Sequence, residues 1–425
     1  MAEHRTAALP RAPTADMTGA SGSSAQHSRR FLRLTGGLLV FLVVGQRLAI
    51  PVAGSAVPMT LIASYIVIVA LLAQGFAEFD RLKSALFIGA ITACVTAAYL
   101  ATWTGTPVSL LSVLLLIAVQ ALWTLRSSAP VAVLHRSLAV FYVRLMVFFA
   151  IVGSGQMALQ LSGVWEYEDL LLVWLPESLL LPDFAVSIPI EYGSDIIKAN
   201  AFVFLEPSFF SQFCALALII AALLRAPAWQ LVVLTLGLIS ALSGTGLLLA
   251  AVGGVALVMR SSGSIRPSYF VAVAVGLIVV TATPASELLL ERAGEPAQAG
   301  SSGSLRFVQP YSEVARGIGE DDHRYVVGAG PGSSERLLAS DRERAGQAVV
   351  YTIVPKLAFE YGLIAGGLFS AFIAFSVLWR PSMPVLPVTL LCMIFFLSGS
   401  LLQPHTVTLA WLLTGFFADR RPPPR

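Results

Sequence analysis

Charged residues are scarce in this chain of 425 residues. Asp, Glu, Lys and Arg make up 12% of the sequence, against roughly 25% in soluble domains. Lysine occurs only at positions 83, 198 and 356, and the net charge of +3 is scattered along the chain. A nucleic-acid-binding surface needs clustered basic residues. The shortage of charge therefore excludes both an ordinary soluble domain and a nucleic-acid partner.

Cysteine is almost as rare, and its three positions exclude two further kinds of site. Cys94, Cys214 and Cys392 each lie inside an apolar run, with no CxxC spacing and no histidine at zinc-ligand spacing. Neither a disulfide framework nor a zinc site fits this pattern. We therefore expect small buried cysteines and no metal centre.

Apolar residues are correspondingly abundant. They make up 56% of the sequence, and the mean hydropathy is +0.80. Apolar runs recur at roughly the 17 to 25 residues that cross a bilayer as a helix. The pattern predicts an all-α polytopic membrane protein in which residues 31–418 form one bundle of about twelve transmembrane helices. The predicted spans are 31–47, 57–77, 84–102, 107–125, 137–158, 202–224, 229–242, 245–259, 267–285, 358–379, 383–402 and 405–418.

Basic residues give this bundle an orientation. They flank alternate ends of the predicted spans, at Arg29, Arg30, Arg33, Arg81, Lys83, Arg126, Arg136, Arg225, Arg260, Arg266, Arg380, Arg420, Arg421 and Arg425. By the positive-inside rule these ends face the cytoplasm. Residues 1–30, rich in Ala, Ser, Thr and Pro, are predicted to form a disordered cytoplasmic tail, and residues 419–425 a second cytoplasmic tail.

The apolar stretch from residue 230 to 259 contains the sequence SGTG at residues 243–246. Gly and Ser favour a turn, so we expect two short helices instead of one long span. Irregular backbone at membrane depth is tolerated only where it is buried in protein or lines a wet cavity. We therefore expect the break to be buried or to line such a cavity.

Two long polar loops, at about 159–201 and 286–356, are predicted to be extracytoplasmic. The first loop is acidic, and the second carries seven arginines, at positions 292, 306, 316, 324, 336, 342 and 344. Arginine binds phosphate oxygens in bidentate geometry, and Gly328, Gly330 and Gly332 permit tight turns and an anion-binding nest. This favours a phosphate-bearing amphiphile as ligand, although a flexible, solvated loop explains the same residues.

Several motifs follow one another through the second half of the chain. They are KANAFVFLEPSFFSQF (198–213), LSGTGLL (242–248), SGSLRF (302–307), GAGPGSS (328–334) and KLAFEYGLIAGGL (356–368). In this order they resemble the signature of the O-antigen polymerase and O-antigen ligase superfamily, whose members have about twelve spans and one large, late periplasmic loop. The chain departs from the family where many members carry a His-Asn pair, here Tyr351 and Thr352, and where many carry Arg, here Lys198.

The resemblance implies a membrane glycosyltransferase of the bacterial inner membrane, acting at its outer face in contact with the lipid bilayer. Its donor would be an undecaprenyl-pyrophosphate-linked oligosaccharide, polymerised into a surface or exopolysaccharide without any cofactor. A chain-length co-polymerase is the partner that the family leads us to expect. The missing ligase-like histidine favours a polymerase over an O-antigen ligase. A transporter or flippase is the alternative from another class, but no internal repeat supports it.

The resemblance also assigns candidate site residues. Arg306 matches the early-loop arginine of the family and is expected to bind the pyrophosphate. The other expected substrate-binding residues are Lys198, Arg316, Arg324, Gly328, Gly330 and Gly332. The candidate catalytic residues, which would take or give protons, are Glu206, His323 and Glu360.

Each of these acid–base candidates has a structural alternative. Glu206 stands where an acid caps a helix N-terminus, and Glu360 is at i,i+4 spacing from Lys356, as in an ion pair. His323 is flanked by Asp322 and Arg324, as in a solvated loop. Arg47 lies near the predicted outer surface, where contact with a phosphate from below is one alternative.

Overall fold

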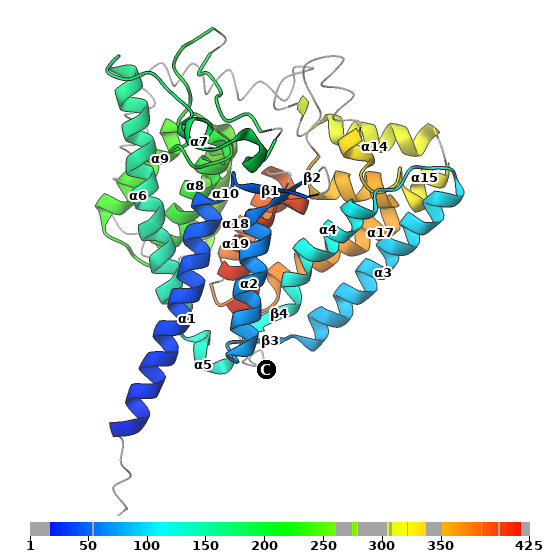
Figure 1. The fold of residues 1–425 in the computed structure, drawn as a ribbon, viewed down its shortest axis with the longest axis horizontal. Coiled ribbons are helices and arrows are strands. Elements are labelled where there is room, and N and C mark those ends of the chain that lie inside the picture. The colour runs from blue at the N-terminus through cyan, green and yellow to red at the C-terminus, as the bar shows by residue number, and fades with distance from the viewer. Residues whose placement is uncertain are drawn as a thin grey trace, which may run out of the picture.

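The computed structural model describes residues 18–52, 55–182, 184–191, 193–260, 274, 276, 278, 304–305, 308–320, 322–336, 351–383, 385–397 and 400–417. These residues are mostly helical (Figure 1). The larger helices are α1 (Thr18–Val44), α2 (Met59–Ala73), α3 (Arg81–Trp103), α4 (Leu110–Gln120), α6 (His135–Leu161), α8 (Pro207–Leu223), α9 (Ala228–Ser240), α10 (Gly244–Arg260), α17 (Ile353–Leu378), α18 (Leu386–Cys392) and α19 (Pro404–Leu413).

These helices are those of a helical membrane protein. Every predicted span except 267–285 overlaps one of these helices. The span 267–285 lies largely outside the described residues. Three described helices, α3, α6 and α17, are long and apolar enough to cross a bilayer. Several others are equally apolar but shorter than a full crossing. The count of twelve spans therefore stays a prediction.

The N-terminal tail and the purely helical fold need correction. Helix α1 begins at Thr18 and so includes part of the segment 1–30 that was predicted to be disordered.

Two short antiparallel sheets also occur in a fold that was predicted to be all-α. Strands β1 (Ala49–Val52) and β2 (Ser55–Pro58) form a hairpin after α1. Strands β3 (Ala77–Phe79) and β4 (Leu125–Ser127) join the connection before α3 to the one after α4. Such pairing satisfies backbone polar groups between the helices.

Helix α8 occupies the centre of the packed core. Fourteen of its residues are buried, and it packs against α6, α9 and α10. Small residues allow this close approach: a Cβ added at Gly153 would lie 2.5 Å from the ring of Phe210, and one at Gly246 would lie 2.5 Å from Ser211 Cβ. Interfaces of small residues are typical of helices that pack within a membrane.

The predicted break in the stretch 230–259 is confirmed. Helix α9 ends at Ser240 and α10 begins at Gly244, with Leu242 in the left-handed region at φ 43°. The Ala199 backbone N–H donates to the Ser240 carbonyl over 3.2 Å. The end of loop one thus satisfies one of the carbonyls that the broken helix leaves free.

Both long loops lie at the same end of the bundle (Figure 1). Loop one contains α7 (Leu170–Trp174) and the short 3-10 helix η2 (Glu177–Leu179), and loop two contains α14 (Gln309–Glu320) and α15 (Asp322–Val327). The pair β3–β4 lies at the opposite end, near the 3-10 helix η6 (Gly415–Phe417). The two long loops were predicted to lie on the same side of the membrane, and this arrangement agrees with that prediction. Which end of the bundle faces the cytoplasm stays a prediction.

Candidate functional site

Residues 328–336, here called the glycine turn, dock against a kink in α17. The kink is at Gly362, whose backbone is non-helical at φ 79°, ψ 169°. Such a kink frees the Phe359 carbonyl from its helical partner, and the Ala329 N–H donates to it over 2.7 Å. A Cβ at Gly328, where φ is +70°, would lie 2.5 Å from the Glu360 carbonyl carbon. Only glycine fits this approach.

The other side of the glycine turn packs on the connection between α3 and α4. The Ser109 N–H donates to the Pro331 carbonyl over 2.9 Å, and a Cβ at Gly332 would lie 2.7 Å from Ser109 Cβ. The close approach that these glycines make is to other parts of the protein, and their expected approach to a ligand stays a prediction. The predicted anion nest is wrong in part, because the N–H groups of Ala329 and Ser333 bond within the chain.

A cavity of about 450 Å³ lies beside this turn. Among the described residues, its lining includes two arginines, a histidine and several residues with hydroxyl groups, and none that is acidic. The hydroxyl of Ser333, a buried residue, has no hydrogen-bond partner within the part of the chain that the structure describes. The lining residues are Thr104, Thr106, Pro107, His323, Arg324, Val327, Gly328, Ala329, Ser333, Arg336 and Phe359.

An ionic cluster formed by the buried Lys356 and Glu360 and the exposed Glu335 supports the glycine turn, and we call it the Lys356 cluster. The Lys356 ammonium contacts the Glu335 carboxylate, lies 3.3 Å from Glu360 Oε1 and donates to Ser334 Oγ over 2.7 Å. Ser334 Oγ donates in turn to Glu360 Oε1 over 2.5 Å. Burial raises the pKa of the Glu335 carboxyl, but the attraction of Lys356 outweighs this and lowers it to about 2. The cluster thus ties the glycine turn to α17.

The short distance between Ser334 and Lys356 raises the question of a serine–lysine nucleophile. Such a pair needs a neutral amine that can take the hydroxyl proton. Here two carboxylates contact the ammonium and favour its charged form. Ser334 is also 0% exposed. The pair is therefore structural, and the chemistry of the site belongs to the adjoining cavity.

The structure brings together some of the predicted loop-two residues. His323 and Arg324, both exposed on α15, line the cavity together with Gly328. Glu360 is 1% exposed and pairs with Lys356, so its structural alternative is the one observed. Arg316 is exposed on α14 and pairs with Glu313, and it is not among the residues that line the cavity.

Other candidates lie elsewhere or beyond the described chain. Arg306 lies outside the described residues. Lys198 is buried in loop one, where its backbone N–H donates to the Ile188 carbonyl. Glu206 is at the N-cap position of α8, and its carboxylate accepts from Ser208 Oγ over 2.9 Å instead of from a backbone N–H. Neither Lys198 nor Glu206 lines the cavity.

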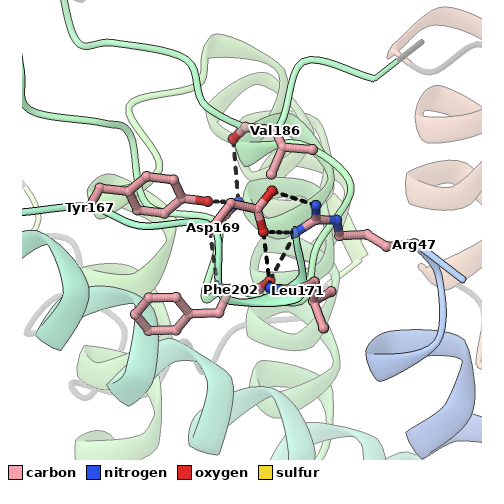
Figure 2. A network of polar contacts seen from close by, with 7 residues as sticks. Arg47, Tyr167, Asp169, Leu171, Val186 and Phe202 are labelled. Atoms are coloured by element: carbon pink, nitrogen blue, oxygen red, sulfur yellow. Dashed lines mark hydrogen bonds and ion pairs between the residues drawn. The ribbon is translucent and has the colours of Figure 1, made fainter. Parts of the chain in front are cut away.

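Arg47 takes part in a second buried network, drawn in Figure 2. Its guanidinium binds the Asp169 carboxylate at 2.7 and 2.6 Å and donates to the Phe202 carbonyl at 3.4 Å. Nearby, Asn200 Nδ2 donates to the Tyr167 hydroxyl over 3.2 Å, and burial raises the pKa of that phenol. Both terminal guanidinium nitrogens of Arg47 bind the Asp169 carboxylate, so the structure does not show the suggested contact with a phosphate.

Sequence reasoning missed the importance of Arg336 and Lys356. Arg336 was one of seven arginines in loop two, and nothing in its neighbours marked it. Its guanidinium lines the cavity and donates to the Pro107 carbonyl over 2.7 Å. Lys356 is one of only three lysines and stands at the edge of an apolar run. That rarity was the available signal for a buried, paired cation.

Replacing Gly328 with Ala is expected to destabilise the protein by about 1–3 kcal/mol, because a left-handed backbone carrying a side chain is strained and its Cβ would meet the α17 backbone. The measurement is thermal unfolding of the detergent-purified protein. Gly319→Ala is the matched control, because Gly319 lies in α14 with nothing within 4 Å of an added Cβ. Equal melting temperatures for the two variants would contradict the docking of the turn.

Among the described residues, no group of three His, Cys, Asp or Glu side chains is placed to hold a metal ion. Comparisons with models of protein families, with curated proteins and with solved structures give no match to this chain.

Proposed function

We propose that this protein polymerises oligosaccharide repeat units carried on undecaprenyl pyrophosphate, as the resemblance to the O-antigen polymerase and ligase superfamily implies. In this proposal the protein crosses the bacterial inner membrane about twelve times. Both termini lie in the cytoplasm and both long loops lie outside it. Its product is a surface polysaccharide or exopolysaccharide, and a chain-length co-polymerase is its expected partner.

The observation that carries the proposal is the cavity beside the glycine turn. Arg324 and Arg336 bring two permanent positive charges to a space of about 450 Å³, and no acidic side chain is among the described residues that line it. Guanidinium groups match phosphate oxygens in charge and geometry. The unpartnered Ser333 hydroxyl adds a further donor. A pyrophosphate group fits this combination of charge, donors and volume.

In the proposed reaction, the oxygen of an acceptor sugar hydroxyl attacks C1 of the donor sugar. A bond forms between that oxygen and C1, while the bond from C1 to the pyrophosphate oxygen breaks and leaves its electron pair on undecaprenyl pyrophosphate. Arg324 and Arg336 stabilise the negative charge that develops there. His323 lines the same cavity, and in this proposal it accepts the proton that the hydroxyl loses.

Replacing Arg324 and Arg336 together with Ala is expected to lower polymer formation by a factor of at least 100, because the loss of fixed charge at a leaving group typically costs about 2.7–4 kcal/mol. The test complements a deletion strain at equal membrane expression and separates its surface glycans by gel electrophoresis. Arg316→Ala is the control, because Arg316 is exposed and pairs with Glu313 outside the cavity.

Each outcome of this experiment has a distinct meaning. Single repeat units in the deletion strain and in the double variant, with long polymer in Arg316→Ala, support the proposal. Full-length polymer left on the lipid carrier after deletion indicates a ligase instead. Wild-type polymer in the double variant would show that the cavity is not the pyrophosphate site.

A further inference from the structure

A second cavity, of about 490 Å³, lies beside β3 and β4, at the end of the bundle opposite the two long loops (Figure 1). We call it the β3–β4 cavity. Its lining comes from this strand pair and from the first turn of α3. The described residues that line it are Glu78, Phe79, Asp80, Arg81, Leu82 and Arg126. None of them lines the cavity beside the glycine turn.

Ion pairs hold the charged side chains of this cavity in place. Arg126 stands opposite Glu78 in the antiparallel register, and its Nε donates to Glu78 Oε1 over 2.8 Å. Its Nη1 lies 3.5 Å from Asp80 Oδ2. The other oxygen of Asp80 caps α3 by accepting from the N–H groups of Leu82 and Lys83, each over 3.1 Å. Charges that are fixed in this way need little ordering when a ligand binds.

The β3–β4 cavity lies where a candidate membrane span begins. Helix α3 is long and apolar enough to cross a bilayer, and Arg81 is its first residue. Phe79 and Leu82, which also line the cavity, are 62% and 45% exposed. Exposed apolar side chains next to an arginine suit the boundary between lipid tails and head groups. We therefore expect a ligand that has both an apolar and a charged part.

The charges that line this cavity select among lipid head groups. Two arginines and two acidic residues are among the described lining residues, so their charges balance. Arg126 is engaged with carboxylates, whereas Arg81 is exposed at the start of α3 and suits a phosphate. The Glu78 side chain is 39% exposed; its carboxylate attracts an amine and repels an anion. A head group with both a phosphate and an ammonium fits better than one with net negative charge.

We propose that the β3–β4 cavity binds a phospholipid whose head group is an aminoethyl phosphate, as in phosphatidylethanolamine. Arg81 binds the phosphate, Glu78 accepts hydrogen bonds from the ammonium, and the acyl chains lie on Phe79 and Leu82. Leu86, one turn further along α3, is 39% exposed and continues this apolar surface. The choline of phosphatidylcholine has no N–H to donate to Glu78, and phosphatidylglycerol carries no cation. The site does not depend on the sugar chemistry of the other cavity.

The test measures lipid binding to the full-length protein, delipidated in detergent, by native mass spectrometry. Phosphatidylethanolamine, phosphatidylcholine and phosphatidylglycerol with identical acyl chains are titrated separately. The dissociation constant is expected to be about tenfold lower for phosphatidylethanolamine, because the other two lipids lack the charged hydrogen bonds to Glu78. Arg81→Ala and Glu78→Gln are each expected to remove this preference. Both side chains are exposed to solvent, so the melting temperature without lipid is expected to stay unchanged.

Arg136→Ala is the matched control and is expected to keep the preference, because Arg136 is an exposed arginine at the start of another candidate span, α6, and is not among the described residues that line the cavity. Equal dissociation constants for the three lipids overturn the lipid site, and so does a preference that survives in both Arg81→Ala and Glu78→Gln. Tightest binding of phosphatidylglycerol also overturns it, because net negative charge is then what the cavity recognises. Soluble phosphoethanolamine that competes at the same concentration as the lipid would replace the phospholipid with a free ligand.

Discussion

Replacing Lys356 with Met is expected to destabilise the protein by about 3–5 kcal/mol, the cost of breaking a buried ion pair from one side. Lys356 is 6% exposed and Glu360 is 1% exposed. Removal of the ammonium leaves the Glu360 carboxylate in the interior with only the Ser334 hydroxyl as a donor among its described contacts. The glycine turn loses its tie to α17 at the same time, so we expect little folded protein after detergent extraction.

A compensated variant distinguishes charge from packing. Lys356→Met combined with Glu360→Gln removes both buried charges, and we expect it to recover most of the lost stability. Glu335→Gln alone is expected to cost less than about 1 kcal/mol, because the Glu335 side chain is 48% exposed and solvent screens its ion pair. The measurement is the melting temperature of each of the three variants in detergent. A double variant as unstable as Lys356→Met would show that the lysine acts through packing instead.

The sequence was sufficient to predict the larger apolar helices among the described residues, because apolar run length is a local property. The same holds for the break at residues 243–246, where Gly and Ser mark a turn within a few residues. The pairing of β3 with β4 was not predictable in this way. Its strands are three residues long and about fifty positions apart, and they form only because the flanking helices bring them together.

The candidate site shows the same limit. Glycines at 328, 330 and 332 permit a tight backbone approach, but their partners are distant in sequence: the first meets the α17 kink, more than thirty residues away, and the other two meet the connection between α3 and α4. The i,i+4 pair of Lys356 and Glu360 followed from helical spacing alone. The orientation of Arg336 into the cavity depends on the packing of the α3–α4 connection. Long-range packing thus decides which of the loop arginines shares a site with His323.

Arg47 gives a sharper example, because its partner is 122 positions away. Loop one offers seven acidic residues, at positions 166, 168, 169, 177, 183, 191 and 195. No local pattern distinguishes Asp169 among them. The structure selects it because the backbone pairing of Leu48 with Leu180 and the bond from the Leu181 N–H to the Arg47 carbonyl bring loop one to the end of α1.

Replacing Asp169 with Leu is expected to destabilise the attachment of loop one by about 3–5 kcal/mol, because it leaves the Arg47 guanidinium buried with no carboxylate partner. The two side chains are only 4% and 9% exposed. Limited proteolysis measures the effect, and cleavage is expected within residues 162–201 well before the helical bundle is cut. Glu168→Leu is the matched control, because Glu168 is the exposed neighbour of Asp169.

Combining Arg47→Met with Asp169→Leu tests whether loop one needs the ion pair itself or only the absence of an uncompensated buried charge. Removing both charges eliminates the buried, uncompensated guanidinium, so most of the stability lost in Asp169→Leu should return. The loop would then be held by its backbone bonds and by the Asn200 and Tyr167 contacts, which do not involve Arg47. Proteolysis of the double variant as fast as that of Asp169→Leu would mean that the bidentate geometry itself positions loop one.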